Sequence, residues 1–373
     1  MVNLLLLFGF TIEDFSPVVN PLRCKFGLHA PAAVVYWRHE EGGGAMTQQK
    51  IYRALSQAEG YLSGEALSRE LGITRAAVWK AVKALQRQGY DIEAVSGLGY
   101  RLQGEGPLRP EDIRRALPYS REHLHVLETV DSTNSQCRRM AAEGAPDGTV
   151  VIAQRQTAGR GRRGRSFESP PGLGLYLSIL WRPRCQVRAL LPLTALCAVA
   201  AARALERSCG APCQIKWPND LVLHGKKLAG ILTEMSVEGE SGAVDYVIVG
   251  IGINVGHRPE DFSPEVAALA TSLAQELEAA PRRSELAAAL IVELDTLRRD
   301  ILPHPGLWLA DYRAGCLNLG KPVQLLYPDG SRRSGRALAV DEDFGLTVEF
   351  PDGTEETVRS GEVSVRGLYG YAE

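Results

Sequence analysis

The chain has 373 residues, of which 45% are hydrophobic and 23% charged, and its formal net charge is −2. These values are typical of a globular protein with two or three domains and a sizeable buried core. They exclude a uniformly polycationic protein, so any nucleic-acid binding has to come from a local basic patch.

The first 45 residues contain an apolar run, MVNLLLLFGF, that fits neither a signal peptide nor a membrane span. No basic residue precedes the run, and no clear small-residue cleavage site follows it. The run is also shorter than a transmembrane helix, which needs about 20 apolar residues. We therefore expect residues 1–45 to be an unstructured or mis-assigned N-terminal extension, with Met46 as the natural first residue.

Residues 46–104 have the pattern of a winged helix-turn-helix domain. A first helix begins near Thr47, a second spans residues 63–72, and Thr74 caps a third. The second and third helices together form a helix-turn-helix. Alternating residues on both sides of the turn SGLG, at 96–99, then predict a β-hairpin, which is the wing.

This domain is predicted to bind DNA. It carries eight Lys or Arg against five Asp or Glu between residues 47 and 103, in a chain that is acidic as a whole. A helix-turn-helix can also be a protein-interaction module, but a wing and a basic third helix together favour DNA. The residues expected at base edges are Thr74, Arg75 and Ala76, and those expected at phosphates are Lys80 and Lys83, with the wing.

Residues 107–319 predict a mixed α/β domain. Its strands and helices do not alternate strictly, which excludes a doubly wound sheet and favours a largely antiparallel one. The expected strands are 124–130, 149–154, 173–181, 220–223 and 246–255, and the expected helices are 190–207 and 284–299.

Residues 321–373 predict a small β-barrel of SH3-like size. Short runs with alternating apolar and polar residues are separated by turns rich in Asp, Gly and Pro. The expected strands are 322–326, 334–340, 345–350 and 356–360.

The stretch GRGRRGR, at 159–165, contains the letters G-x-G-x-x-G of dinucleotide sites and kinase phosphate loops. A dinucleotide site needs a helix at its third glycine, and Pro170 and Pro171 prevent one. The later kinase motifs are absent from the sequence. Apolar strands on both sides also argue against a disordered Arg/Gly segment. We therefore expect a loop that binds an anion between two strands.

Five motifs follow one another in the order found in biotin-protein ligases. They are ETVDSTN at 128–134, QTAGRGRRGR at 156–165, KWPND at 216–220, KLAGIL at 227–232 and GIGIN at 250–254. From about residue 47 to the C-terminus, the chain resembles the bifunctional bacterial form, a biotin ligase joined to a biotin operon repressor. The resemblance implies a central domain of the class II aminoacyl-tRNA synthetase-like type.

The resemblance also implies a two-step reaction. Biotin carboxylate attacks the α-phosphate of ATP to give biotinyl-5′-adenylate, and a lysine of a biotin carboxyl carrier protein then attacks the adenylate. Because two anions meet in the first step, cations are needed between them. Mg²⁺ would arrive with ATP, since the seven histidines show no metal-ligand spacing.

Residue roles follow from the matched motifs. Ser132, Thr133 and Asn134 match the segment that binds the ureido ring, although such a segment after a strand is also a helix N-cap. The other residues implied at biotin are Gln156, Arg160, Gly161, Arg162 and Lys227, of which Arg162 and Lys227 are the catalytic cations. The residues implied near the nucleotide are Lys216, Asn219, Asp220, Asn254 and Arg366. Phe167 stands where the bacterial enzymes have tryptophan against the adenylate, which puts nucleotide packing in doubt.

A winged helix fused to a ligase implies regulation by the adenylate. We expect an adenylate-dependent homodimer that binds a palindromic operator of biotin genes. The seven cysteines form no CxxC pair, which favours a reducing, cytoplasmic compartment with no membrane partner. Two alternatives stay open: a lipoate-protein ligase-like acyltransferase, and a non-catalytic biotin-sensing DNA-binding protein.

Overall fold

The structure is a computed structural model that describes residues 43–58, 60–103, 106–239, 241–301, 304–327, 329–359 and 364–367. The expected N-terminal extension, apart from its last three residues, lies outside this range.

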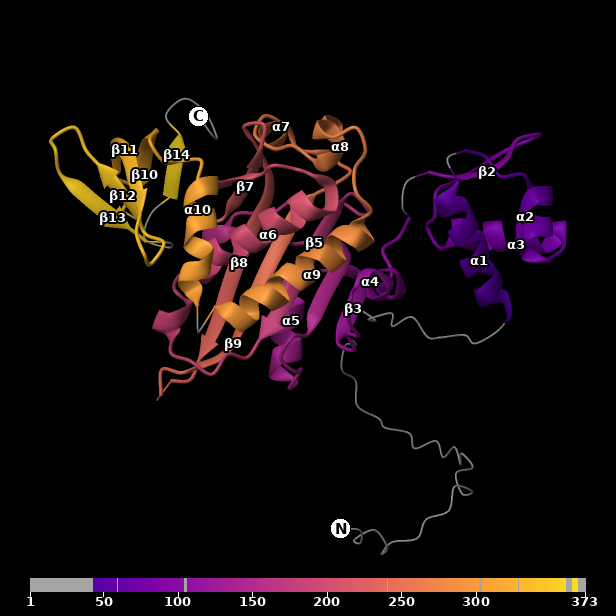
Figure 1. The fold of residues 1–373 in the computed structure, drawn as a ribbon, viewed down its shortest axis with the longest axis horizontal. Coiled ribbons are helices and arrows are strands. Elements are labelled where there is room, and N and C mark those ends of the chain that lie inside the picture. The colour runs from indigo at the N-terminus through magenta and orange to yellow at the C-terminus, as the bar shows by residue number, and fades with distance from the viewer. Residues whose placement is uncertain are drawn as a thin grey trace, which may run out of the picture. The chain divides into compact units, whose positions relative to one another are not determined.

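The winged helix-turn-helix is confirmed (Figure 1). Its elements are α1 (Gly43–Gln57), α2 (Gly64–Leu71), α3 (Arg75–Arg87), β1 (Ile92–Val95) and β2 (Gly99–Leu102). Helix α1 begins at Gly43, four residues before the predicted start. Ser63 and Thr74 cap α2 and α3 as expected, each through a side-chain oxygen that accepts a backbone N–H. The domain has a hydrophobic core of its own, centred on Leu67, Val78 and Leu85.

A seven-stranded sheet is the central element of the domain that follows the winged helix. Its strands are β3 (Leu124–Val130), β4 (Val150–Gln156), β5 (Gly174–Trp181), β6 (Gln214–Lys216), β7 (Asp220–Leu223), β8 (Lys226–Val237) and β9 (Val244–Asn254). The spatial order is β3-β4-β5-β9-β8-β7-β6, and every pair except β3–β4 is antiparallel. The largely antiparallel sheet is thus as predicted, with β6 and the long strand β8 added.

Helices cover the two faces of this sheet. Figure 1 shows α6 (Leu193–Cys209) and α9 (Arg283–Asp300) lying across the same face, and both share one core with Val150, Ile152 and Ile179. The small helix α5 (Thr133–Ala142) covers the other face, where its Cys137 packs with Val151. Among the described residues, the segment Val187–Cys209 is long and apolar enough to span a membrane, but 61% of its apolar window is buried inside the fold.

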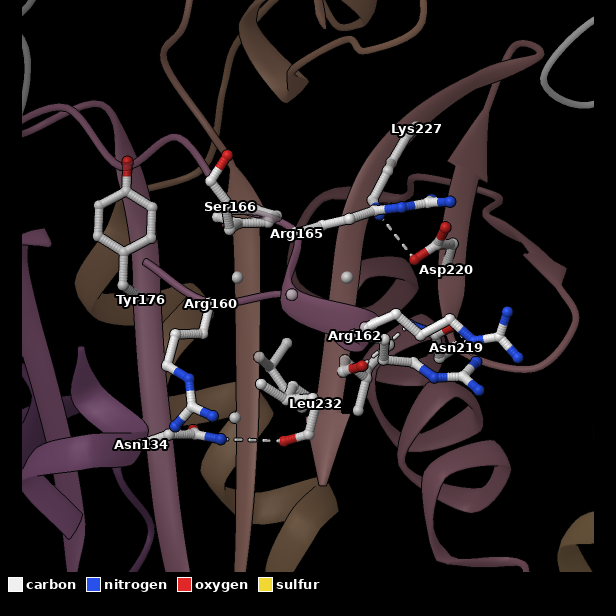
Figure 2. A pocket seen from close by; sticks show the side chains of 18 of the residues that line it. Asn134, Arg160, Arg162, Arg165, Ser166, Tyr176, Asn219, Asp220, Lys227 and Leu232 are labelled. Carbon is white, nitrogen blue, oxygen red and sulfur yellow. Dashed lines mark hydrogen bonds and ion pairs between the residues drawn. The ribbon is translucent and has the colours of Figure 1, made fainter. Parts of the chain in front are cut away.

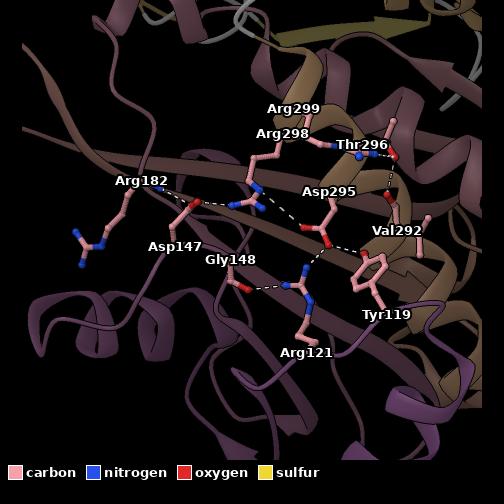
Figure 3. Close-up of polar contacts among 10 residues, drawn as sticks. All are labelled: Tyr119, Arg121, Asp147, Gly148, Arg182, Val292, Asp295, Thr296, Arg298 and Arg299. Atoms are coloured by element: carbon pink, nitrogen blue, oxygen red, sulfur yellow. Dashed lines mark hydrogen bonds and ion pairs between the residues drawn. The ribbon is translucent and has the colours of Figure 1, made fainter. Parts of the chain in front are cut away.

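Several shorter helices complete the domain. They are α4 (Pro110–Ala116), α7 (Pro264–Ala267), α8 (Leu273–Glu276), α10 (Leu309–Gly315) and the 3-10 turns η1 (Arg162–Gly164), η2 (Val187–Leu190), η3 (Pro259–Asp261) and η4 (Pro305–Trp308). A polar network ties α9 to the segment before β3 (Figure 3). In it the Asp295 carboxylate accepts from Arg121 and Tyr119, and Arg298 of α9 pairs with Asp147. Since Arg121 and Asp295 are nearly buried, this network fixes the outer edge of the sheet.

The C-terminal strands are β10 (Pro322–Leu326), β11 (Arg332–Val340), β12 (Leu346–Glu349), β13 (Glu355–Val358) and β14 (Ser364–Gly367). Their order is β13-β12-β11-β10-β14. The sheet is open, because β13 and β14 do not pair within the described residues, so the expected barrel closure is not found. Trp217 connects this sheet to the central domain: its indole N–H donates to the Phe344 carbonyl at 3.0 Å.

Candidate active site

A pocket of about 560 Å³ opens at one end of the central sheet (Figure 2). Strands β4, β5, β7, β8 and β9 supply its floor, and the arginine loop at 159–165 forms one wall. It brings together most of the residues predicted from the motifs. Those that line it are Ser132, Thr133, Asn134, Gln156, Arg160, Gly161, Arg162, Phe167, Lys216, Asn219, Asp220 and Lys227.

The segment Ser132–Asn134 is buried at the start of α5. Ser132 occupies the N-cap position, but its hydroxyl makes no capping bond, so capping does not explain this residue. The Asn134 amide donates to the Glu234 carboxylate at 2.9 Å and to the Leu232 carbonyl at 3.3 Å. Its amide oxygen lies 2.6 Å from the Ser178 hydroxyl, which donates to it. These partners fix which way the Asn134 amide faces.

Two glycines of the GIGIN motif make room for this end of the pocket. A Cβ on Gly250 would lie 2.0 Å from the Asn134 amide oxygen, and one on Gly252 would lie 2.6 Å from the Phe167 ring. Both glycines are on β9, in the middle of the sheet. The motif therefore lets two pocket side chains lie directly against the strand.

Gln156 joins the polar end of the pocket to the arginine loop. Its amide oxygen accepts from the Thr133 backbone N–H at 2.9 Å, and its amide nitrogen donates to the Ser169 hydroxyl at 2.8 Å. Gln156 ends β4, and Ser169 follows the loop. The Gln156 side chain thus links the start of α5 to the segment that follows the arginine loop.

The loop itself is ordered by backbone bonds. The Phe167 N–H donates to the Gly159 carbonyl at 2.9 Å, and the Gly161 N–H donates to the Arg165 carbonyl at 2.7 Å. At its tip, Arg163 and Gly164 have positive φ angles of 56° and 72°. The only helical structure in the loop is the single turn η1, so no helix follows the third glycine and the dinucleotide interpretation stays excluded.

Two arginines of the loop point to different ends of the pocket (Figure 2). Arg162 donates to the Asn219 amide oxygen at 3.0 Å, and burial lowers the pKa of its guanidinium, while nearby Asp220 opposes that shift. Arg160 forms an ion pair with Glu234 at 3.1 Å. Arg162 therefore lies on the KWPND side and Arg160 on the Asn134 side.

Lys227 lies on β8 beside Asp220 of β7, with its amine 2.8 Å from the carboxylate oxygen. Gly230 passes close below the lysine: a Cβ there would be 3.3 Å from the Lys227 amine. Lys216 is almost fully buried at the end of β6 and lines the same region. Three predicted cations thus converge with one carboxylate at this end, an arrangement suited to a substrate with several negative charges.

Of the predicted nucleotide residues whose side chains the structure describes, Asn254 does not line the pocket. The Asn254 amide is buried and donates to the Thr271 carbonyl at 2.9 Å, so it fixes a loop. The side chain of Arg366 lies outside what the structure describes, but its backbone pairs with Gln324, which does line the pocket. Phe167 does line the pocket, in edge-on contact with Tyr176 at 6.4 Å between ring centroids.

Sequence reasoning missed several residues at the site. Glu234 is the most connected of them, since it accepts from Asn134, Arg138 and Arg160. It comes seven positions after Lys227 on a strand that was not predicted. Ser178, Tyr176 and Trp217 lie within predicted or recognised segments, but neither alternation nor spacing distinguishes them from core residues.

The residues predicted at DNA lie on the outer face of α3. Thr74, Arg75, Ala76, Lys80 and Lys83 are all exposed, and none of them forms an ion pair in the part of the chain that the structure describes. No group of three or more potential metal ligands occurs among the described residues.

Known proteins resemble both the central domain and the winged helix-turn-helix domain of this chain. The biotin/lipoate A/B protein ligase family model matches residues 126–254, and a helix-turn-helix domain model matches residues 47–101. The Bifunctional ligase/repressor BirA of Bacillus subtilis is 36% identical over 79% of this chain and 91% of its own length. The Escherichia coli protein of the same name is 33% identical over 85% of this chain and 96% of its own.

The chain belongs to the bifunctional biotin-protein ligases.

A solved structure agrees with the ligase part. The biotin protein ligase from Aquifex aeolicus in complex with biotin and ATP has a TM-score of 0.57 and 30% identity to this ligase. The match covers 66% of this chain and all of that one. The pocket of this ligase is therefore built on a fold that holds both substrates in a relative.

Proposed function

We propose that the chain activates biotin with ATP to biotinyl-5′-adenylate and transfers biotin to a lysine of a biotin carboxyl carrier protein. The observation that supports this most directly is the division of one pocket into two ends. Short polar side chains gather at Asn134, and the cations Arg162, Lys216 and Lys227 gather at the other end, around Asn219 and Asp220. A neutral ureido ring suits the first end, and a carboxylate beside a phosphate suits the second.

In the first step, the biotin carboxylate and the α-phosphate repel each other. Arg162 and Lys227 would each contact one or both anions and offset the repulsion as the new O–P bond forms and pyrophosphate leaves. Asp220 holds the Lys227 amine in place before substrate arrives, through the 2.8 Å ion pair. Asn219 orients Arg162 in the same way.

In the second step, a neutral lysine amine of the acceptor attacks the acyl carbon, and AMP leaves. The adenylate must first be protected from water, and the loop 159–165 is suited to this because it borders the pocket between two strands. Phe167 offers the adenylate an apolar ring without an indole N–H. Mg²⁺ would be held chiefly by the ATP phosphates, with Asp220 as the acidic side chain among the described lining residues.

We further propose that the adenylate-bound form dimerises and binds the operator of biotin genes through α3 and the wing, in the cytoplasm. The support is the basic, exposed face of α3 and the repressor named in the relatives. We also propose two fold assignments. The meander β10 to β13, with β14 returning beside β10, has the strand order of an SH3-like domain, and the central domain is proposed to be class II synthetase-like.

Incubation with ATP, labelled biotin and a biotin carboxyl carrier domain tests the ligase function. Label should appear on the carrier and AMP should be released. Arg162→Gly should still form adenylate but lose it from the pocket several-fold faster, as measured by dilution of the loaded enzyme into unlabelled biotin. Transfer of lipoate in preference to biotin would favour the lipoate alternative, and DNA binding without any transfer would favour the non-catalytic sensor.

A further inference from the structure

Trp79 lies in the middle of α3 and is 57% exposed, which is unusual for the largest apolar side chain. The residues that hold α3 in its domain, Val78, Val82 and Leu85, are all buried, whereas Trp79 lies to one side of that buried face. Within the described chain, no aromatic or cation–π contact involves Trp79. Its indole therefore does not contribute to the core of the winged helix.

The neighbours of Trp79 on the helix surface are basic. Arg75 precedes it by four residues and Lys83 follows it by four, a spacing that places all three side chains on one stripe. Lys80 lies beside the stripe, and Ala76 leaves a gap next to the indole. An apolar ring flanked by cations complements a surface that has apolar groups between rows of phosphates.

The major groove of DNA has this chemistry, because each thymine presents its C5-methyl group there. We propose that Trp79 is a specificity-determining residue of the DNA interface, whose indole packs against thymine methyl groups in the major groove between Arg75 and Lys83. This inference rests on the proposed repressor function and adds to it a stated sequence preference. Lys83, with Lys80, supplies affinity for any sequence, and Trp79 adds discrimination to that expected from Arg75 at the base edges.

The test starts from the full-length protein with biotin and ATP, which selects its preferred duplex from a random pool. The selected duplex is then synthesised with thymine and again with uracil, which lacks the methyl group. For the wild-type protein, removal of each contacted methyl should weaken binding about fourfold. Trp79→Ala should bind the thymine duplex about tenfold more weakly than wild type, and it should no longer distinguish the two duplexes.

Two further variants separate this role from others. Lys83→Gln should weaken binding to all sequences and reduce the salt dependence by about one ion, while Trp79→Ala keeps the salt dependence of the wild type. Trp79→Phe should recover part of the discrimination. Biotin transfer should be unchanged in Trp79→Ala, which confirms that the ligase part is folded, and the retained salt dependence of DNA binding shows that the winged helix is folded too.

Three outcomes would overturn the proposed role of Trp79. If the wild type selects no sequence, both the repressor function and this inference are overturned. If the wild type selects a sequence and Trp79→Ala discriminates thymine from uracil equally well, only the inference is overturned. If Trp79→Ala changes self-association in sedimentation and leaves DNA affinity intact, the exposed face binds a second copy of the chain, and the inference is again wrong.

Discussion

Gly250 lies on β9 against Asn134, and a methyl group in its place would be 2.0 Å from the Asn134 amide oxygen. We expect Gly250→Ala to push Asn134 out of its bonds with Ser178 and Glu234 and to raise the KM for biotin at least about tenfold, or about 1.4 kcal/mol. The KM for ATP should change much less.

Gly256→Ala is a suitable control for this substitution. A Cβ at Gly256 would be 3.8 Å from its nearest neighbour, an ordinary contact, and Gly256 follows the same strand. It should therefore leave the KM for biotin within about twofold of wild type, a change of less than 0.5 kcal/mol. Equal effects of both substitutions would show that the change in KM does not come from Asn134.

Glu234 connects three elements: it accepts from Asn134 and Arg138 of α5 and pairs with Arg160 of the arginine loop, from its own position on β8. Glu234→Gln keeps the size of the side chain but removes the charge that holds Arg160. Since Arg160 is 43% exposed, the pair is worth at most about 1 kcal/mol. We expect bound adenylate to leave roughly two to five times faster, measured by dilution into unlabelled biotin.

Arg138→Gln provides the matched control, because Arg138 contacts the same carboxylate at 2.7 Å but lies outside the loop. It should release adenylate at the wild-type rate. A double substitution of Glu234 and Arg160 should be no worse than the more severe single substitution, since both break one contact. Additive effects would mean that Glu234 acts on the site through Asn134 alone.

At the scale of elements, the sequence predicted what local patterns determine. Strand β3 was predicted with its observed bounds, and α6 and α9 were predicted to within a few residues, because long apolar runs with flanking turn residues are strong signals. Strand β8 was missed because KKLAGILTEMSV does not alternate, being buried on both faces near Ala229 and exposed farther on. Helix α5 was missed because it is polar and buries only small side chains such as Cys137.

Local sequence patterns did not predict which strands, distant in the sequence, pair with one another. The open C-terminal sheet differs from the predicted barrel because closure depends on the register between distant strands, which no local pattern encodes. Most of the pocket could be predicted because its motifs are contiguous. Glu234, which contacts the pocket residues Asn134 and Arg160, and Gln324, which lines the pocket, could not be predicted, since only the fold brings them there.

For the molecule as a whole, acid stability should depend on His257. This side chain is fully buried and stacks on Phe262 with ring centroids 4.8 Å apart, and neither of its ring nitrogens has a hydrogen-bond partner among the residues that the structure describes. Burial lowers its pKa from 6.5 to about 4, although Asp261 and Glu168 oppose the shift. The folded chain therefore holds His257 neutral, whereas the unfolded chain takes up a proton below pH 6.5.

Above pH 6.5, His257 is neutral in both states and does not reduce the free energy of unfolding. As the pH falls from 6.5 toward 4, the free energy of unfolding decreases, because only the unfolded chain binds a proton at His257. At pH 5 the loss should be about 2 kcal/mol. His257→Phe keeps the stacking and removes the titration, so its free energy of unfolding should fall less between pH 7 and pH 5 than that of wild type. Urea titrations at the two pH values measure this, and parallel losses in both proteins would contradict it.

Lys227 is an amine within the pocket where an acyl adenylate is proposed to form, and a neutral amine there would itself be acylated. Asp220 holds this amine in an ion pair at 2.8 Å, and an ammonium group has no lone pair with which to attack. We expect Asp220→Asn, supplied with synthetic biotinyl adenylate, to accumulate biotin on Lys227 in peptide mass spectra, while wild type stays unmodified. An unmodified Lys227 in the loaded variant would contradict this. If biotin does accumulate in the variant, the ion pair acts as a protecting group: it lets the ligase form a reagent that reacts with lysine while keeping a lysine of its own beside it.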